Sequence, residues 1–294
     1  NAFSEVILQD ANGGKYTENR SGNDVLLTFS VNRDGSVFYV DGYTEKLLKD
    51  FYVQNITENI QINEINADTI VEKTITVNGK AIVEGEDYTV TLDKGEGTWH
   101  RYTYSIKKSV FEKEGEYNIV IFTKDRANNQ AYSDIKNVTA KFVVDMTAPT
   151  VTIAGLKSDG RYRTDKQVVT VIPSDDGGLL KKLIIRTVDE YGNVIKELIN
   201  LEGEALLEAV AAGNITFELG EGLYQNVQII CEDAAGNITG ESASGELYEN
   251  ISVSTNAFLI FWANKVARIT SIVGAGVLFA GIGIFAVLKR KRIF

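Results

Sequence analysis

The chain has 294 residues, with 40 Asp and Glu against 30 Lys and Arg, which gives a formal net charge of −10. This acidic balance makes nucleic acid and anionic lipid poor partners, because both are bound through clustered cations. One cysteine, Cys231, and one histidine, His100, exclude an intramolecular disulfide and a Cys/His zinc site within one chain. A Ser-His-Asp triad would have to run through His100.

Residues 1–36 contain short apolar runs that echo a later part of the chain. A turn-like segment at 10–14 leads to the apolar run at 26–31, much as residues 125–129 lead to 140–144. We therefore expect residues 1–36 to be the last strands of a preceding domain whose front lies outside this sequence. The alternative is that these strands complete the sheet of the first full domain.

From Val6 to Val253 the dominant pattern is an alternation of apolar and polar residues in short runs rich in Val, Ile, Thr, Tyr and Phe. Gly, Asn and Asp separate the runs, which are 25–31, 98–106, 117–123, 168–172, 183–188 and 227–231. Such alternation predicts half-buried antiparallel strands, and hence an all-β fold of sandwich domains. One short helix is predicted, at Glu204–Ala212, crossing between the sheets of the second sandwich.

A repeated motif divides this β-rich part into two full domains, 37–146 and 147–256. Gly115-Glu-Tyr117, an alternating run and Asp125 to Asn129 recur as Gly222-Leu-Tyr224, an alternating run and Asp233 to Asn237. Pro149, one of only two prolines, lies at the boundary. Because proline fixes φ, it predicts a stiff join and domains that project as a rod.

These residues resemble a known family. Gly-x-Tyr, an alternating strand, Asp-x-Ala-Gly-Asn and a strand ending in Asp-x-Thr-Ala-Pro are similar to the bacterial immunoglobulin-like (Big-type) repeat domains of Gram-positive cell-surface proteins. The resemblance covers roughly residues 37–254 and is most specific at 115–129 with 144–150. It implies tandem immunoglobulin-like β-sandwiches that serve as spacers or as adhesion modules.

The repeated residues have a simple structural interpretation. Tyr117 and Tyr224 are each expected to bury the ring and return the hydroxyl to the backbone, as in a tyrosine corner. Asp125 and Asp233 are expected to start hairpin turns. A structural calcium site built from either aspartate is the minority alternative, as is metal binding at Asp175-Asp176.

No catalytic, cofactor-binding or metal-ligating residue is assigned from the sequence, and no cofactor is expected. By alternation, His100 shares a strand face with Tyr102 and Tyr104, which predicts a hydrogen-bonded, partly buried histidine. Cys231 ends an apolar run and is expected to be a small buried apolar residue rather than a reactive thiol.

The carboxyl-terminal region predicts a membrane anchor. Ile269–Leu288 is a run of 20 residues without a charge, followed by a basic cytoplasmic tail at 289–294. A helix of this length spans the hydrocarbon core of about 30 Å, and the cations favour a cytoplasmic C-terminus. Residues 257–268 are expected to lie at the outer interface. Gly276 and Ala280 form a small-residue pair that permits self-association of the helix.

Together these features predict a non-enzymatic, single-pass surface protein whose immunoglobulin-like domains form an extracellular stalk or adhesin. Its expected partners are the lipid bilayer and an extracellular protein or glycan, with no nucleic acid. One alternative is the spacer and anchor region of a large surface hydrolase whose catalytic domain lies upstream. Another is a carbohydrate- or protein-binding module, for which the candidate aromatic residues are Trp99, Tyr102 and Tyr104.

Overall fold

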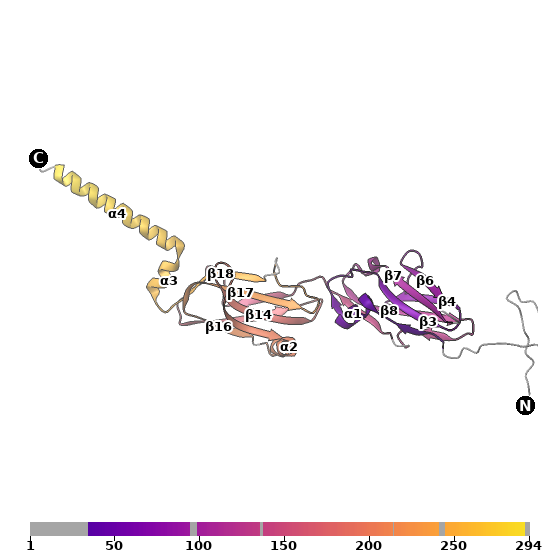
Figure 1. Ribbon diagram of the computed structural model, residues 1–294. Helices are drawn as coiled ribbons and strands as arrows, with labels where there is room; N and C mark the ends of the chain where they lie inside the picture. Colours follow the sequence, from indigo (N-terminus) through magenta and orange to yellow (C-terminus); the bar gives the residue numbers. More distant parts are fainter. Residues whose placement is uncertain (1–34, 95–98, 136–137, 214, 241–244, 292–294) are drawn as a thin grey trace, which may run out of the picture.

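The computed structural model describes residues 35–94, 99–135, 138–213, 215–240 and 245–291. Two β-sandwiches lie end to end in chain order, and two helices follow the second sandwich (Figure 1). Each sandwich buries its own apolar core, one within residues 38–144 and the other within 156–253. The strands predicted for residues 1–36 lie outside the described residues, apart from Gly35 and Ser36.

The first domain packs two sheets face to face. One sheet has the order β1 (Val37–Tyr39), β3 (Ile60–Asn66), β7 (His100–Ile106), β6 (Tyr88–Lys94). The other has the order β2 (Tyr52–Val53), β10 (Ala140–Val144), β8 (Gly115–Asp125), β4 (Ile70–Val77), β5 (Lys80–Ala81), with β9 (Gln130–Tyr132) also paired to β8. Helix α1 (Gly42–Asp50) precedes β2, and the 3-10 helix η1 (Lys108–Phe111) precedes β8.

The second domain repeats this plan. Its smaller sheet has the order β11 (Thr150–Ala154), β13 (Lys166–Ser174), β16 (Thr216–Gly220). Its larger sheet has the order β12 (Arg161–Tyr162), β18 (Glu246–Val253), β17 (Gly222–Asp233), β14 (Leu180–Val188), β15 (Val194–Glu202). Helix α2 (Gly203–Ala212) connects β15 in one sheet to β16 in the other.

The strand order identifies both domains as immunoglobulin-like. In each domain the first segment of chain pairs antiparallel in one sheet, and the next short strand pairs in parallel with the last strand of the other sheet, β2 with β10 and β12 with β18. In the larger sheets, β8 lies between β10 and β4, and β17 likewise lies between β18 and β14. This is the arrangement of immunoglobulin sandwiches, so the predicted all-β fold is confirmed.

Alternation along the strands explains the cores. In β8 the side chains of Tyr117, Ile119 and Ile121 are buried, while the residues between them are partly exposed. Successive side chains of a strand point to opposite faces, so one face of β8 enters the core and the other does not. Burial of such apolar side chains contributes about 1.5–3 kcal/mol each, which is the main force that holds the two sheets together.

Of the two α-helices within the domains, the sequence pattern predicted α2 but not α1. Helix α2 begins one residue before the predicted segment and buries Leu206, and Gly213 ends it with a φ of 66°. Glycine adopts this left-handed conformation without steric cost. Helix α1 was not predicted; it is short and mostly polar, and it buries only Thr44 and Leu47.

Two asparagines divide the carboxyl-terminal region into α3 (Ala257–Ala263) and α4 (Lys265–Lys291). The Asn256 side chain accepts from the amides of Phe258 and Leu259, and Asn264 accepts from those of Val266 and Ala267. Each asparagine caps a new helix. Among the described residues, no helix taken alone has the length and apolar composition to cross a bilayer, whereas α3 and Lys265–Ala280 have them together across a 91° bend.

Candidate cation site at the domain junction

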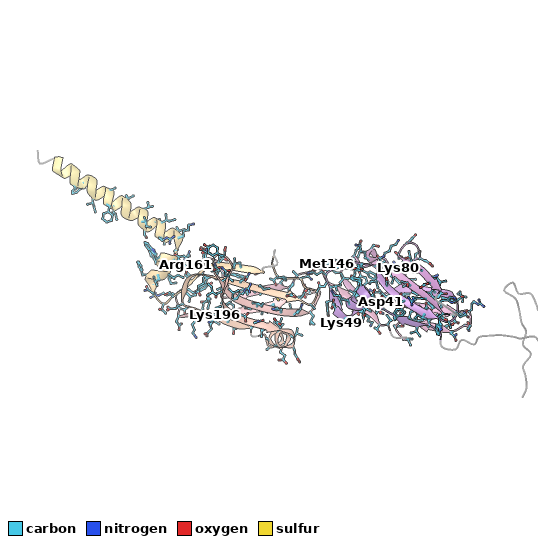
Figure 2. The ribbon with its side chains drawn as sticks, viewed as in Figure 1. Asp41, Lys49, Lys80, Met146, Arg161 and Lys196 are labelled. Carbon is cyan, nitrogen blue, oxygen red and sulfur yellow. The ribbon has the colours of Figure 1, made fainter. Side chains whose placement is uncertain are left out.

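The linker between the domains is short and is held from both sides. Five residues, Asp145 to Pro149, separate β10 from β11. The Asp145 amide donates to the Val53 carbonyl of the first domain at 2.9 Å, and the Asp145 carbonyl accepts from Asn237 Nδ2 of the second domain at 2.8 Å. Met146 lies in the narrow waist between the two domains (Figure 2). The junction is therefore a hydrogen-bonded structure rather than a free hinge.

The turn after β17 supplies the first carboxylate of the junction. Asp233 is fully buried, and its two oxygens accept from the backbone N and from Nδ2 of Asn237, each at 2.8 Å. The Asp233 amide donates back to the Asn237 carbonyl at 3.1 Å. These bonds are the turn chemistry predicted for the repeated motif. They leave Asn237 Nδ2 shared between Asp233 and the Asp145 carbonyl, which ties the turn to the linker.

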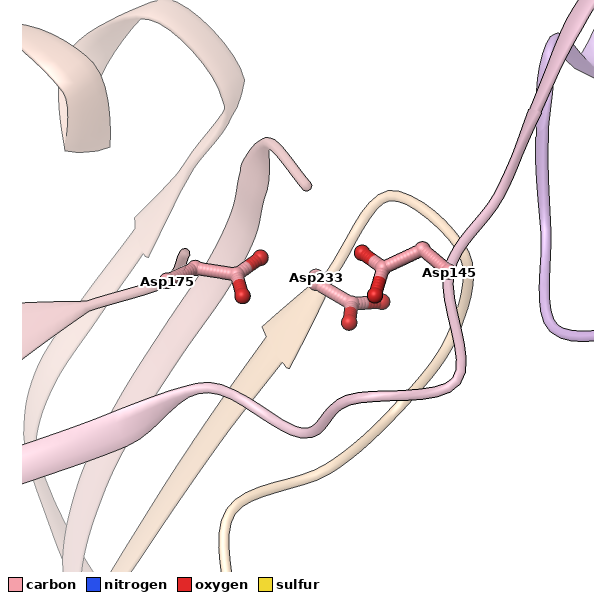
Figure 3. A group of neighbouring side chains, drawn as sticks. All are labelled: Asp145, Asp175 and Asp233. Carbon is pink, nitrogen blue, oxygen red and sulfur yellow. The ribbon is translucent and has the colours of Figure 1, made fainter. Parts of the chain in front are cut away.

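Two further carboxylates converge on Asp233. Asp145 comes from the linker, and Asp175 comes from the loop between β13 and β14. One oxygen from each of the three side chains can be chosen so that all lie within 4.8 Å of one another. Figure 3 shows the three carboxylates directed toward a common space. Residues far apart in the sequence thus meet at the end of the second domain that faces the first.

Most of the oxygens brought by Asp145 and Asp175 have no hydrogen-bond partner among the described residues. Asp145 is 1% exposed, and its Oδ1 accepts from the Thr147 amide at 3.1 Å, but Oδ2 accepts no hydrogen bond. Both Asp175 oxygens are buried and also lack a partner. No ion pair with Lys or Arg involves these carboxylates in the described part of the chain. Such groups are unusual, since nearly all buried polar atoms in native proteins are hydrogen-bonded.

Burial dominates the electrostatics of the junction. It raises the pKa of the Asp145 carboxyl above its ordinary value, and the nearby Asp233 and Asp175 carboxylates raise it further against the opposing Thr147 amide. Burial likewise raises the pKa of Asp175, with Asp233 adding to the effect. The amides of Gly177 and Gly178 oppose this rise, although neither is placed well enough to count as a hydrogen bond.

Two glycines allow the loop to approach the carboxylates this closely. A Cβ atom on Gly178 would lie 2.1 Å from Asp145 Oδ2 and 2.9 Å from Asp175 Oδ2. A Cβ atom on Gly177 would lie 2.8 Å from Asp145 Oδ1. Any side chain at either position would therefore displace the carboxylates. The segment 175–178 therefore forms a loop that carries one acid, Asp175, and leaves room for a second, Asp145.

The distal end of the first domain has the same turn with a different neighbour. Asp125 accepts from the backbone N and from Nδ2 of Asn129 at 2.8 and 2.9 Å, as Asp233 does from Asn237. Val37 pairs with Ile65 where Thr150 pairs with Ser174, so the next residues, Asn66 and Asp175, are equivalent. Asn66 is fully buried and donates to Asp125 Oδ2 at 3.4 Å and to Ser36 Oγ at 2.9 Å. An amide therefore occupies the position that a carboxylate holds at the junction.

The two repeated tyrosines do not share one environment. Tyr117 is 9% exposed and its hydroxyl donates to the Lys113 carbonyl at 2.8 Å, which confirms the tyrosine corner in the first domain. For Tyr224 the prediction is wrong. Register shifts in β17 and a φ of 56° turn Tyr224 outward, where it is 45% exposed. Its hydroxyl instead accepts from Arg268 Nη1 of α4 at 3.4 Å.

The remaining predicted residues occupy ordinary structural positions. His100 is partly buried, as expected, but its Nδ1 atom has no hydrogen-bond partner in the part of the chain that the structure describes. Cys231 is fully buried in the core, and burial raises its thiol pKa to about 11. Tyr102 and Tyr104 are buried, whereas Trp99 is 52% exposed.

Sequence reasoning missed two buried acids, Asp145 and Glu64. Glu64 is fully buried and accepts from the hydroxyls of Ser36, Tyr104 and Thr123. Burial raises its pKa, and these hydroxyls oppose the rise. Alternation with the core residue Ile62 was the available signal for Glu64. For Asp145 the neighbouring buried strand β10 was the signal, but the convergence with Asp175 and Asp233 is not visible in the sequence.

No protein-family model and no curated protein sequence matches the chain. Among solved structures, it is similar to the fibronectin(III)-like modules of Clostridium thermocellum CbhA, with 15% identity over 69% of this chain and 88% of that one and a TM-score of 0.30. The I9–I11 tandem of titin is 12% identical over 69% of this chain and 62% of that one, with a TM-score of 0.23. The C-terminal domain of the Streptococcus agalactiae AgI/II polypeptide BspA is 10% identical over 69% and 96%, with a TM-score of 0.21. All are distant likenesses, and the immunoglobulin-like assignment follows from this chain's own strand order.

Proposed function

We propose that this chain is the membrane-proximal part of a cell-surface protein, in which two immunoglobulin-like domains form a non-catalytic spacer anchored by α3 and α4. The observation that carries the proposal is the junction, because a spacer keeps its reach only if its joints resist bending. A five-residue linker with hydrogen bonds to both domains supports such resistance.

A repeated clamp supports the same conclusion. The Glu114 carboxylate accepts from the Met146 amide and from the Thr147 hydroxyl, each at 2.7 Å, which fixes the exit of the first domain. Glu221 does the same at the exit of the second domain, where it accepts from the amide and hydroxyl of Thr255 at 2.7 and 2.9 Å. Both exits are thus held by an acid that directly precedes a strand of the larger sheet, Glu114 before β8 and Glu221 before β17. The chain leaves each domain in a defined direction.

The exposed apolar surface of α3 and α4 supports the anchor. Helix α4 contains the whole predicted span 269–288, and its large apolar side chains stand free of the domains, with Phe279 at 76% and Leu278 at 68% exposed. Apolar surface of this extent calls for an apolar surrounding, which a bilayer provides. The exposed rings of Phe258 and Trp262 on α3 suit the headgroup region.

Energy transfer to the bilayer tests the proposal. Exposed Lys80 in the first domain and exposed Lys196 in the second are each replaced by cysteine and labelled, while the buried Cys231 stays unmodified. The full chain is placed in liposomes that contain an acceptor lipid. We expect weaker transfer from position 80 than from 196. Equal transfer from both positions, or a chain that alkaline carbonate extracts from the liposomes, would contradict the proposal.

Glycan binding is a second candidate, favoured by one surface feature. Exposed Trp99 lines a shallow apolar hollow together with Asp93 and Arg101. An exposed ring beside charged hydrogen-bonding groups suits the apolar face and hydroxyls of a sugar. A glycan array should then give signals that Trp99→Ala removes and Tyr191→Ala, at another exposed ring, retains. No signal from the unmodified chain would retire this candidate.

A further inference from the structure

The carboxylate cluster at the junction needs a partner that the described residues do not supply. Asp145 is buried and its carboxylate is directed at the other two (Figure 3), and within the described residues its Oδ2 atom accepts no hydrogen bond. An unpaired charge in such a position carries a large desolvation cost. Two ordinary remedies exist, namely a proton shared between carboxyl groups or a bound cation.

The first domain shows that the fold does not require this arrangement. There, the amide of Asn66 stands at the position of Asp175 and donates to the turn aspartate. The same turn at the junction faces two extra acids instead. The Asp175 carboxylate repels those of Asp145 and Asp233 and lowers the stability of the fold when no ligand is bound. Its presence therefore indicates a ligand of opposite charge.

The donor set selects the ion. All three ligands are carboxylate oxygens, which suit hard cations, and no histidine or cysteine ligand is among them. The chosen oxygens lie within 4.8 Å of one another, so one cation can reach all three. Calcium accepts several protein carboxylates in a flexible geometry, whereas magnesium demands a near-ideal octahedron and usually keeps several of its waters, so the cluster suits calcium better.

We propose that Asp145, Asp175 and Asp233 bind one Ca²⁺ ion at the junction between the two domains. The ion joins the linker to two separate segments of the second domain, the β13–β14 loop and the end of β17. Because the linker amide of Asp145 is also bonded to Val53, calcium fixes the first domain as well. This consequence rests on the proposed spacer function, but the binding itself does not.

Titration calorimetry of the full chain in detergent micelles tests the site, with CaCl₂ added after removal of calcium by EDTA. We expect one ion per chain with a dissociation constant of about 10⁻³ M or tighter, as in extracellular calcium modules. Asp175→Asn should weaken binding at least tenfold. This variant is expected to fold, because Asn66 occupies the equivalent position in the first domain. The matched control Asp176→Asn changes an exposed acid of the same loop and should bind within about twofold of the unmodified chain.

Calorimetry measures calcium binding directly and does not depend on the distance of the first domain from the bilayer. A failure of the calcium site can therefore be distinguished from a failure of the spacer proposal. The absence of a calcium signal from the unmodified chain would overturn the site. Equal affinity of Asp175→Asn and Asp176→Asn would also overturn it. Thermal unfolding provides a second measurement, in which calcium raises the melting temperature of the unmodified chain and leaves that of Asp175→Asn unchanged.

Discussion

The ends of the two domains carry the same turn but complete it differently. At the distal end of the first domain, Asp125 lies beside the Asn66 amide, and the neighbouring acid Glu64 is surrounded by hydroxyls. At the junction, Asp233 lies beside the carboxylates of Asp145 and Asp175. One backbone frame therefore supports either a set of internal hydrogen bonds or a cluster of negative charge.

The difference teaches that the Asp-x-Ala-x-Asn turn is not itself a metal site. In both domains the asparagine satisfies the aspartate in nearly identical geometry. Two features distinguish the junction, namely an acid in place of an amide at the residue that follows β13 and a second acid from the linker. Variants that exchange these features between the domains test the comparison.

The largest effect is expected for Asn66→Asp, which gives the first domain the acid of the junction. The substitution removes an amide donor to Asp125 and places a third buried carboxyl near Glu64. Breaking a buried charged network in this way costs about 3–5 kcal/mol. Hydrogen exchange of peptides from β8 should show the loss, with peptides from β17 unchanged as the internal control.

A smaller loss is expected for Gly178→Ala, because the added Cβ would lie 2.1 Å from Asp145 Oδ2. Displacement of the loop should cost the second domain about 1–3 kcal/mol and weaken calcium binding. Gly220→Ala is the matched control, since no atom lies within 4 Å of its Cβ position. Chemical unfolding and calorimetry of both variants measure the difference. Normal calcium affinity in Gly178→Ala would contradict the geometry.

The two repeated tyrosines, Tyr117 and Tyr224, allow a third comparison between the domains. Tyr117→Phe removes the hydrogen bond to the Lys113 carbonyl and should cost about 0.5–1.5 kcal/mol. Tyr224→Phe should cost less than about 0.5 kcal/mol, because this hydroxyl is exposed. Urea unfolding measures both. Equal losses would show that the outward position of Tyr224 is wrong.

The smallest and most gradual effect is that of pH. The pKa values of Asp145 and Asp175 are raised above 3.8, so without calcium the folded state binds protons more tightly than the unfolded state. Their contribution to stability is then fully present below pH 3.8 and is lost as the pH rises through the raised pKa values. Calcium competes with these protons, so the stabilisation by calcium should grow over the same range. Asp175→Asn should flatten both dependences in unfolding experiments between about pH 4 and 7.

Alternation, turn residues and the repeat were enough to predict the sandwich fold, because the alternation of apolar and polar residues along a strand indicates which of its faces is buried. They were also enough for the turn role of Asp125 and Asp233 and for the corner at Tyr117. The outward rotation of Tyr224 was not predictable, because it depends on register shifts in β17 that the matching letters Gly-x-Tyr conceal. The single-pass helix at 269–288 stays a prediction.

The cation site was beyond the sequence for a different reason. Its three aspartates belong to a linker, a loop and a strand end that only the packing of the second domain brings together. The motif indicated Asp233, and the pair Asp175-Asp176 was noted on its own. Nothing in the spacing joined these residues to Asp145, since proximity across a sandwich is set by sheet topology.

The distance between the two domains tests the calcium-fixed junction most directly. Spin labels on the double variant Lys80→Cys, Lys196→Cys report this distance by pulsed electron paramagnetic resonance, in the full chain in a lipid nanodisc. We expect a narrow distribution with calcium, a broader one in EDTA, and a broad one under both conditions for Asp175→Asn. Distributions of the same width with and without calcium would contradict the account.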